Sequence, residues 1–483
     1  MQIYSGQALE KYKKEALRID PSWNRRDFAN RVENHLKART VKILVVGGLR
    51  GTGKTIGILQ AAEPFDALYV ISQKDEAETG RDYIELLKRT EKKYVIIDEY
   101  GWIQDRRALD EYLLTSMQNG KRIVLTGTES ISLEMLNYGA LIHRADIVHT
   151  TMFPYEEYRK VYGLEHSPKV CDDYLTSGGI FREYVAANYD TMKEYIDSAI
   201  VRNLADYMKE EMDEERARTL TYAVLYKAVC PSNLSNVPVL CDHRMELQNF
   251  LDTMGVNTGV VIEQKDLNRV EDIFIEIGVI VCIPNYYRDS SLKKQYYITN
   301  PSLTCQLIKA AYGLQDISDD ILGHVFEAIV MTQLSAKKLT EHRLYFMNSS
   351  GHSGAQTKEL DAVITDIEEE HVYFFEFKHT KNVRLESNEP MLSGYIEETY
   401  FPAADIDGRY VVYKGEPCVK EYTGGDVLFT PPSHILDDYF AFEAHSKNVK
   451  RIHTKQEEIE GGDSESARGF SLKKAKEEKG DSG

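Results

Sequence analysis

The feature that most constrains the fold is an apolar run followed at once by a glycine-rich loop. Residues 41–55 read VKILVVGGLRGTGKT, and the first part is apolar and largely β-branched apart from Lys42. Such a run predicts a buried strand, and the loop after it matches the pattern G-x-x-x-x-G-K-[ST]. Glycines there let backbone N–H groups approach a phosphate. We therefore expect a phosphate-binding loop, with the next helix pointing its positive end at the same anion.

All eight residues of this loop are expected to surround a nucleotide. Lys54 brings a mobile cation to the β- and γ-phosphates, and Thr55 offers a hydroxyl to Mg²⁺. The predicted nucleotide-binding residues are Gly48, Leu49, Arg50, Gly51, Thr52, Gly53, Lys54 and Thr55. A glycine-rich turn without a ligand is the alternative interpretation. The strand before the loop and the helix after it favour nucleotide binding.

A second apolar run ends in two carboxylates. Residues 94–97 precede Asp98 and Glu99, and ligands of open α/β sheets bind outside the carboxyl ends of the strands. We expect Asp98 to act with Thr55 as a metal ligand in the Mg²⁺ shell. Glu99 is expected to polarise a water for attack on the γ-phosphate. The alternative, a helix N-cap after a strand, would need the aspartate alone.

Three further strands complete the predicted sheet, and the first of them is the short apolar run at residues 67–71. Residues 122–128 (RIVLTGT) form one, and either Thr126 or Thr128 at its end can reach the γ-phosphate or the attacking water. Residues 145–149 form a fifth strand. Strands this apolar, alternating with helices, predict an α/β fold with a parallel sheet and helices on both faces.

Several segments together resemble one group of prokaryotic AAA+ ATPases. They are GGLRGTGKT, IIDEYGWIQD, VLTGTES, ALIHRADIVHTTMFPYEEY and, at residues 174–179, YLTSGG. The resemblance implies ATP and Mg²⁺ as cofactors. It also implies that a winged-helix-like region and a C-terminal domain related to restriction-endonuclease folds follow the ATPase module.

The same resemblance implies a role for Arg144, which precedes the fifth strand. An arginine at this edge of an AAA+ module senses or stabilises the γ-phosphate. We expect it to act on a neighbouring subunit of a homo-oligomer. The alternative is a surface arginine that caps a helix C-terminus.

Residues 190–300 are expected to be helical and then strand-like. Three helices followed by a hairpin predict a winged-helix-like connector of the α+β type. The helix in the recognition position carries Asp266, Glu271, Asp272 and Glu276 against Lys265 and Arg269. Such a face would repel phosphates, and the net charge of −18 also opposes broad affinity for nucleic acid. We expect this region to pack against protein.

The last constellation combines a helix with a hairpin. Residues 319–339 form a long helix with Glu327, and residues 358–378 form two adjacent strands. The strand period places Glu376 and Lys378 on one face, with aromatic residues on the opposite, core side. Asp361 starts the partner strand, so its carboxylate can converge on theirs.

This hairpin resembles the PD-(D/E)xK nuclease motif. The resemblance makes Asp361 and Glu376 metal ligands, gives Lys378 the task of orienting a water, and matches Glu327 to the helical acid of such sites. A Mg²⁺ held there would activate water and neutralise a scissile phosphate. The alternative is a sheet whose open face merely carries charges. Many relatives of this fold bind without cutting, so a catalytically inactive partner-binding module also remains.

Length and composition suggest a multidomain cytoplasmic protein. The chain has 42% hydrophobic and 28% charged residues, as ordinary globular proteins do. No apolar run is long enough to cross a bilayer, no signal-peptide segment is seen, and six scattered cysteines form no C-x-x-C pair. The predicted parts are a helical lead-in (1–40), an ATPase domain (41–190), a helical and winged-helix-like region (191–310), a restriction-endonuclease-like domain (311–445) and a disordered charged tail (446–483).

Overall fold

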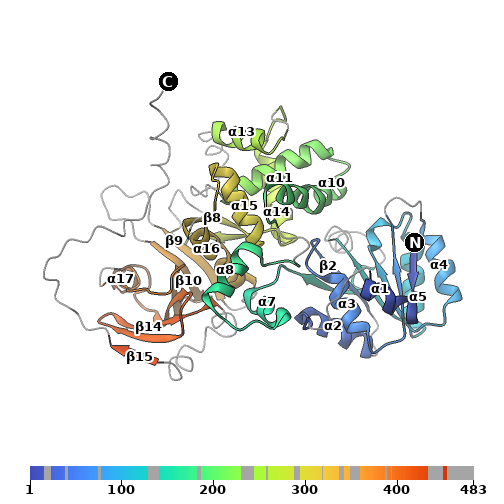
Figure 1. The fold of residues 1–483 in the computed structure, drawn as a ribbon, viewed down its shortest axis with the longest axis horizontal. Helices are drawn as coiled ribbons and strands as arrows, with labels where there is room; N and C mark the ends of the chain where they lie inside the picture. Colours follow the sequence, from blue (N-terminus) through green and yellow to red (C-terminus); the bar gives the residue numbers. More distant parts are fainter. Residues whose placement is uncertain are drawn as a thin grey trace.

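The computed structural model describes most of the chain, in fifteen segments. These are residues 1–15, 23–38, 42–73, 78–128, 141–181, 186–229, 244–256, 259–287, 294–317, 319–336, 342–348, 359–386, 389–392, 394–432 and 450–453. A sheet formed by the first third of the chain lies at one end of the molecule, and a second sheet formed by the last third lies at the other (Figure 1). Helices from the middle of the chain lie between them (Figure 1).

The first sheet has six strands in the order β1-β3-β4-β5-β2-β6. The strands are β1 (Gln2–Tyr4), β2 (Ile43–Gly48), β3 (Ala67–Ile71), β4 (Tyr94–Asp98), β5 (Arg122–Gly127) and β6 (Ala145–Thr150). β2 to β6 run parallel, and β1 pairs antiparallel with β3 at the edge. Because β5 separates β2 from β4, the phosphate loop and the two carboxylates end on strands that flank β5.

Helices cover both faces of this sheet, which confirms the predicted α/β arrangement. They are α1 (Gly6–Glu15), α2 (Asp27–Lys37), α3 (Lys54–Ala62), α4 (Gly80–Arg89) and α5 (Arg107–Gln118). Side chains of α1, α2 and α3 share one apolar cluster with the sheet, and those of α4 and α5 share the cluster on the other face. The lead-in is not wholly helical, contrary to the prediction for residues 1–40, because β1 completes the open edge of β3.

The middle of the chain is mainly helical and ends in a hairpin. Its elements are α7 (Tyr155–Tyr162), α8 (Pro168–Ser177), α9 (Tyr189–Tyr195), η3 (Ile196–Val201), α10 (Arg202–Tyr207), α11 (Glu214–Val229), α13 (Arg244–Thr253), α14 (Gln264–Glu276), β7 (Ile280–Pro284), β8 (Lys294–Ile298) and α15 (Pro301–Tyr312). The predicted acidic face of the helix at 264–276 is wrong in one respect. Glu271 is buried and pairs with Lys227 of α11 at 2.5 Å, so its charge faces the interior.

The second sheet has seven strands in the order β15-β13-β14-β12-β11-β10-β9. The elements are α16 (Asp319–Ala336), β9 (His342–Asn348), β10 (Glu359–Asp366), β11 (His371–Lys378), α17 (Tyr395–Tyr400), β12 (Asp405–Tyr413), β13 (Cys418–Tyr422), β14 (Gly425–Thr430) and β15 (Lys450–His453). β9, β10 and β11 form an antiparallel meander, and β12 runs parallel to β11. The predicted disordered tail from 446 is wrong at β15, which pairs with β13. Backbone pairing at a sheet edge needs no apolar side chain, so composition did not indicate it.

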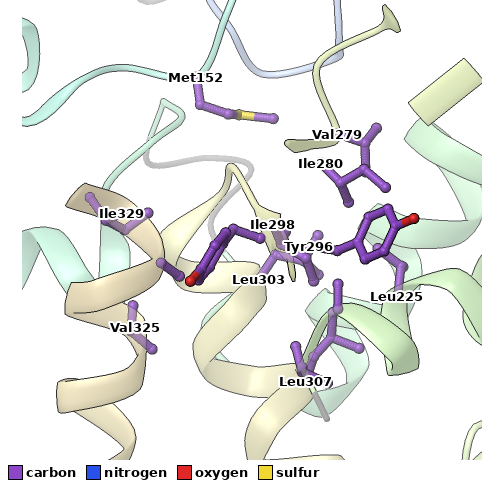
Figure 2. Close-up of a cluster of buried hydrophobic side chains, with 14 of the residues drawn as sticks. Met152, Leu225, Val279, Ile280, Tyr296, Ile298, Leu303, Leu307, Val325 and Ile329 are labelled. Atoms are coloured by element: carbon purple, nitrogen blue, oxygen red, sulfur yellow. The ribbon is translucent and has the colours of Figure 1, made fainter. Parts of the chain in front are cut away.

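One continuous cluster of buried side chains connects these parts. It extends from Leu49 in the phosphate loop to Phe375 in the C-terminal sheet. Figure 2 shows its middle, where β8, α11, α15 and α16 contribute Tyr296, Leu225, Leu303 and Val325. The predicted boundaries at 190 and 310 therefore do not separate independent apolar cores.

Candidate active site

The phosphate loop follows β2 and is shaped by two close approaches to its glycines. Gly53 has a φ of 79° and precedes α3. A Cβ on Gly53 would lie 2.0 Å from Cε2 of Phe181, and one on Gly48 would lie 1.8 Å from Oγ1 of Thr150. Both positions therefore require glycine, because neighbouring side chains occupy the space.

Groups outside the motif hold the carbonyl oxygens of the loop. The Thr52 carbonyl accepts a hydrogen bond from Arg26 Nη1 (2.5 Å), and the Gly51 carbonyl accepts one from the Phe181 N–H (3.0 Å). The Arg50 carbonyl accepts one from the Tyr195 hydroxyl (3.1 Å). Carbonyls held in this way are not free to turn toward a ligand, which favours a loop whose concave side is lined by N–H groups.

Lys54, Thr55 and Asp98 lie where the loop meets the end of β4. Lys54 is buried, and its ammonium group donates to the carbonyls of Gly48 (2.6 Å) and Leu49 (3.1 Å). The Thr55 hydroxyl donates to Asp98 Oδ2 at 2.8 Å, and the Tyr69 hydroxyl donates to the same oxygen. The structure therefore brings together the loop hydroxyl and the strand-end carboxylate that were predicted as metal ligands.

Glu99 follows Asp98 in a left-handed backbone conformation, with a φ of 53°. Such a conformation is costly for a residue other than glycine and occurs often at functional sites. Its N–H donates to Asp98 Oδ1 at 3.0 Å. Burial, together with the charge of Asp98, raises the pKa of Glu99 to about 7, while Lys54 and Arg50 oppose the shift.

Thr126 is buried at the end of β5, opposite Val46 of β2. Among the described residues, its Oγ1 has no hydrogen-bond partner. In the pairing of β5 with β4, Leu125 lies opposite Ile97, so Thr126 lies beside the end of β4 that carries the carboxylates. Thr128 is half-buried and takes part in other interactions.

Arg144 does not join the phosphate loop of its own chain. It is exposed and precedes β6, and its carbonyl accepts a hydrogen bond from the N–H of Ile43 at the start of β2. The loop lies beyond the other end of the same strand, about 17 Å away at roughly 3.3 Å per residue. Within one chain the two sites are thus at opposite ends of the parallel strands.

The C-terminal carboxylates gather around the β10–β11 pair. Ala362 lies opposite Phe375, and the same register places Asp361 beside Glu376. Asp361 Oδ2 accepts a hydrogen bond from the Phe377 N–H at 2.6 Å, and Lys378 donates to Glu376 Oε1 at 2.5 Å. From α16, Glu327 accepts a hydrogen bond from the Tyr297 hydroxyl at 3.0 Å.

Burial dominates the electrostatics of this cluster. It raises the pKa of Asp361 to about 6, against the opposing influence of Lys378. Burial and the charge of Asp361 raise the pKa of Glu327 and of Glu376 to about 8 each. Nearby carboxylates that resist ionisation would be stabilised in their charged form by a cation.

Other side chains cover the face of the sheet that carries Glu376. The strand period had predicted that only the opposite face packs in the core. Phe374 shares that face, and it packs in an apolar cluster with Leu392 and Ile396. Phe375 and Phe377 pack in the cluster on the other face, as predicted. In the described segments, no group of three or more His, Cys, Asp or Glu side chains is arranged to hold a metal ion. A metal here would depend on two carboxylates with other oxygen ligands.

Sequence reasoning missed the residues that hold the loop from outside, namely Arg26, Phe181 and Tyr195. Their contacts with the loop are with backbone carbonyls, so no pairing of side-chain types along the sequence reveals those contacts. Arg26 and Tyr195 lie 26 and 145 residues from their loop partners. The only sequence signal is an arginine pair, Arg25 and Arg26, before the first buried strand.

The fold and the loop geometry define a P-loop nucleotide-binding domain in the first part of the chain. Residues 40–159 match the family model described as an AAA domain. No curated protein matches the sequence. Within the described residues, no helix has the length and apolar character needed to span a membrane.

Solved structures with some similarity include two ORC proteins bound to DNA and a branch migration motor. Drosophila ORC bound to DNA is 10% identical, with 60% of this chain and 88% of that chain covered and a TM-score of 0.25. The Aeropyrum pernix ORC1 protein in complex with DNA is 11% identical, with coverages of 59% and 90% and a TM-score of 0.23. The Thermotoga maritima RuvB Holliday junction branch migration motor is 12% identical, with coverages of 59% and 94% and a TM-score of 0.26. At TM-scores this low, these similarities indicate nothing further about this chain.

Proposed function

We propose that this protein binds ATP with Mg²⁺ at the phosphate loop and hydrolyses it. The observation that carries the proposal is the 2.8 Å contact between the Thr55 hydroxyl and Asp98. It joins the end of the loop to the end of β4, and both oxygens are of the hard type that Mg²⁺ prefers. The match of residues 40–159 to an AAA domain supports the same activity.

Each residue then has a definite task. Lys54 exchanges its contacts with the Gly48 and Leu49 carbonyls for contacts with the β- and γ-phosphates. Thr55 and Asp98 would hold Mg²⁺, which would neutralise charge on the phosphates. Glu99 orients and deprotonates the attacking water. Thr126 is a better candidate than Thr128 for contacting the water or the γ-phosphate, because its hydroxyl has no hydrogen-bond partner within the described segments.

The test separates binding from hydrolysis. Glu99→Gln keeps the size of the side chain but removes the base, so ATP should still bind while turnover falls by about 10²–10⁴-fold. Lys54→Ala should abolish tight binding, because the loop loses its mobile cation. ATP affinity by calorimetry and phosphate release by a coupled assay are the measurements. Parent-level hydrolysis by Glu99→Gln would show that another group is the base.

A second function is proposed for the C-terminal domain, namely magnesium-dependent cleavage of nucleic acid by a restriction-endonuclease-like site. The observation that favours it is the convergence of Asp361, Glu376 and Lys378 at one end of the hairpin. The order helix α16, antiparallel meander β9–β11, helix α17 and parallel strand β12 is also consistent with this fold. The alternative is a nucleotide-controlled switch whose C-terminal domain binds a partner and cuts nothing.

Thermal unfolding with Mn²⁺ or chelator, in the absence of ATP, distinguishes these two functions. A metal held by Asp361 and Glu376 stabilises the folded state by mass action, so Mn²⁺ should raise the Tm of the parent and not that of Asp361→Asn. Lys378→Ala should keep the metal effect and lose cleavage of DNA or RNA, because its task is to position water and offset developing charge. Identical unfolding curves for the parent and for Asp361→Asn, each with Mn²⁺ and with chelator, would favour the partner-binding switch.

A further inference from the structure

Arg26, which directly precedes α2, contacts the phosphate loop and two later segments of the chain. Its Nε and Nη2 donate to the two carboxylate oxygens of Glu157 in α7, at 3.0 and 2.5 Å. Its Nη1 donates to the carbonyls of Thr52 at 2.5 Å and of Thr151 at 3.0 Å. One guanidinium group therefore joins the phosphate loop, the segment after β6 and α7.

This guanidinium is also locked by packing. Arg26 is 4% exposed, and its Cζ lies 4.1 Å from the centre of the Phe153 ring. The Asp27 N–H donates to Glu157 as well, at 2.8 Å, which fixes the carboxylate that pairs with Arg26. A planar donor held this way has little freedom to leave its acceptors.

A second buried ion pair, Lys227 with Glu271, provides a comparison for the pair formed by Arg26 and Glu157. Lys227 and Glu271 are as deeply buried, at 2.5 Å, and Lys227 lies over the Tyr296 ring. That pair joins α11 to α14, and among the described residues no hydrogen bond or ion pair connects it to the loop. Burial of a charge pair therefore does not by itself explain why Arg26 also uses Nη1 on Thr52, a residue of the loop motif.

We propose that Arg26 is a positioning residue for the nucleotide phosphates, acting through the Thr52 carbonyl. By holding that oxygen outward, Arg26 keeps the peptide between Thr52 and Gly53 in the orientation that presents the following N–H to phosphate. The inference rests on the proposed ATP binding. It adds a part of the site that lies outside the motif, in a segment that precedes the first buried strand.

The test removes the anchor without leaving a buried charge. Arg26→Met alone would strand Glu157, whereas the double variant Arg26→Met/Glu157→Met replaces both charges with apolar groups. Its apo Tm should fall less than that of Arg26→Met alone, and its Kd for ATP and ADP should rise about tenfold or more, the loss expected for a charged hydrogen bond. Lys227→Met/Glu271→Met makes the same exchange away from the loop and should leave both Kd values unchanged.

Arg26→Lys gives an independent test if the double variant folds poorly. Lysine keeps the charge opposite Glu157 but lacks the planar fork that reaches Glu157 and two carbonyls together. ATP affinity should fall by several-fold, with adenosine affinity unchanged because adenosine carries no phosphate. Parent-like ATP affinity in either folded variant would overturn the role of Arg26. Failure of the parent itself to bind ATP would instead refute the proposed function, and the role of Arg26 with it.

Discussion

Replacing Gly53 by alanine tests the packing around the phosphate loop most directly. The left-handed backbone at Gly53 costs an alanine about 1–2 kcal/mol. The new Cβ would also lie 2.0 Å from Phe181, whose ring is buried against Trp23 and Phe153 with centroids 5.2 and 4.9 Å away. Displacing such a ring adds about 1–3 kcal/mol. We therefore expect Gly53→Ala to lower the free energy of unfolding by about 2–5 kcal/mol.

Gly163 provides the matched control. It ends α7 with a φ of 62°, and among the described residues no atom beyond the adjoining backbone and chain neighbours lies within 4 Å of the position that its Cβ would occupy. Gly163→Ala should therefore cost only the backbone contribution, about 1–2 kcal/mol. Denaturant unfolding measures both variants, and ATP binding should be lost only in Gly53→Ala.

The double variant Gly53→Ala/Phe181→Ala isolates the clash. Removing the ring opens space for the new methyl group, so the two substitutions together should destabilise less than the sum of their separate effects. Equal costs for Gly53→Ala and Gly163→Ala, or strict additivity in the double variant, would refute the argument that Phe181 fills the space beside the loop.

Two further predictions concern pH and assembly. Burial lowers the pKa of His35, whose Nε2 lies 3.2 Å from the Ile123 carbonyl, so the unfolded state binds more protons below about pH 6.5. The parent should lose stability as pH falls from 7 to 5, and His35→Gln should lose less; equal pH dependence of unfolding in the two proteins would contradict this. If Arg144 acts on a neighbouring subunit, ATPase activity per protomer should rise with concentration, and mixing Arg144→Ala with Lys54→Ala protein should partly restore it. Constant specific activity over a wide dilution series would exclude the intersubunit role.

The sequence predicted the elements whose apolar content is high. β2, β4 and β5 are runs of buried aliphatic residues with functional groups at their ends, and such runs leave few alternatives to a covered parallel sheet. The contact between Thr55 and Asp98 follows from that order. β1 and β15 were missed because they are three and four residues long and depend on an edge that other strands supply.

Side-chain direction was harder to predict than element type. Glu271 belongs to a helix that was predicted, yet it faces inward because Lys227 on another helix supplies its counter-charge. The face of β11 with Glu376 is covered by segments that follow it in the chain, which the alternation within one strand does not reveal. Arg26 was not predicted as a site residue because its acceptors include the backbone carbonyls of Thr52 and Thr151, which every residue type provides.

The continuous buried cluster has a practical consequence for dividing this protein into fragments. A cut near residue 310 would leave α15 on one piece and α16 on the other. Side chains of both helices belong to a single buried cluster, namely Leu303, Leu307, Val325 and Ile329 (Figure 2). Each fragment would expose an apolar surface to water and would be prone to aggregate. We therefore expect neither expression as two complementary halves nor limited proteolysis to yield a stable ATPase core, because one buried cluster crosses the predicted domain boundary.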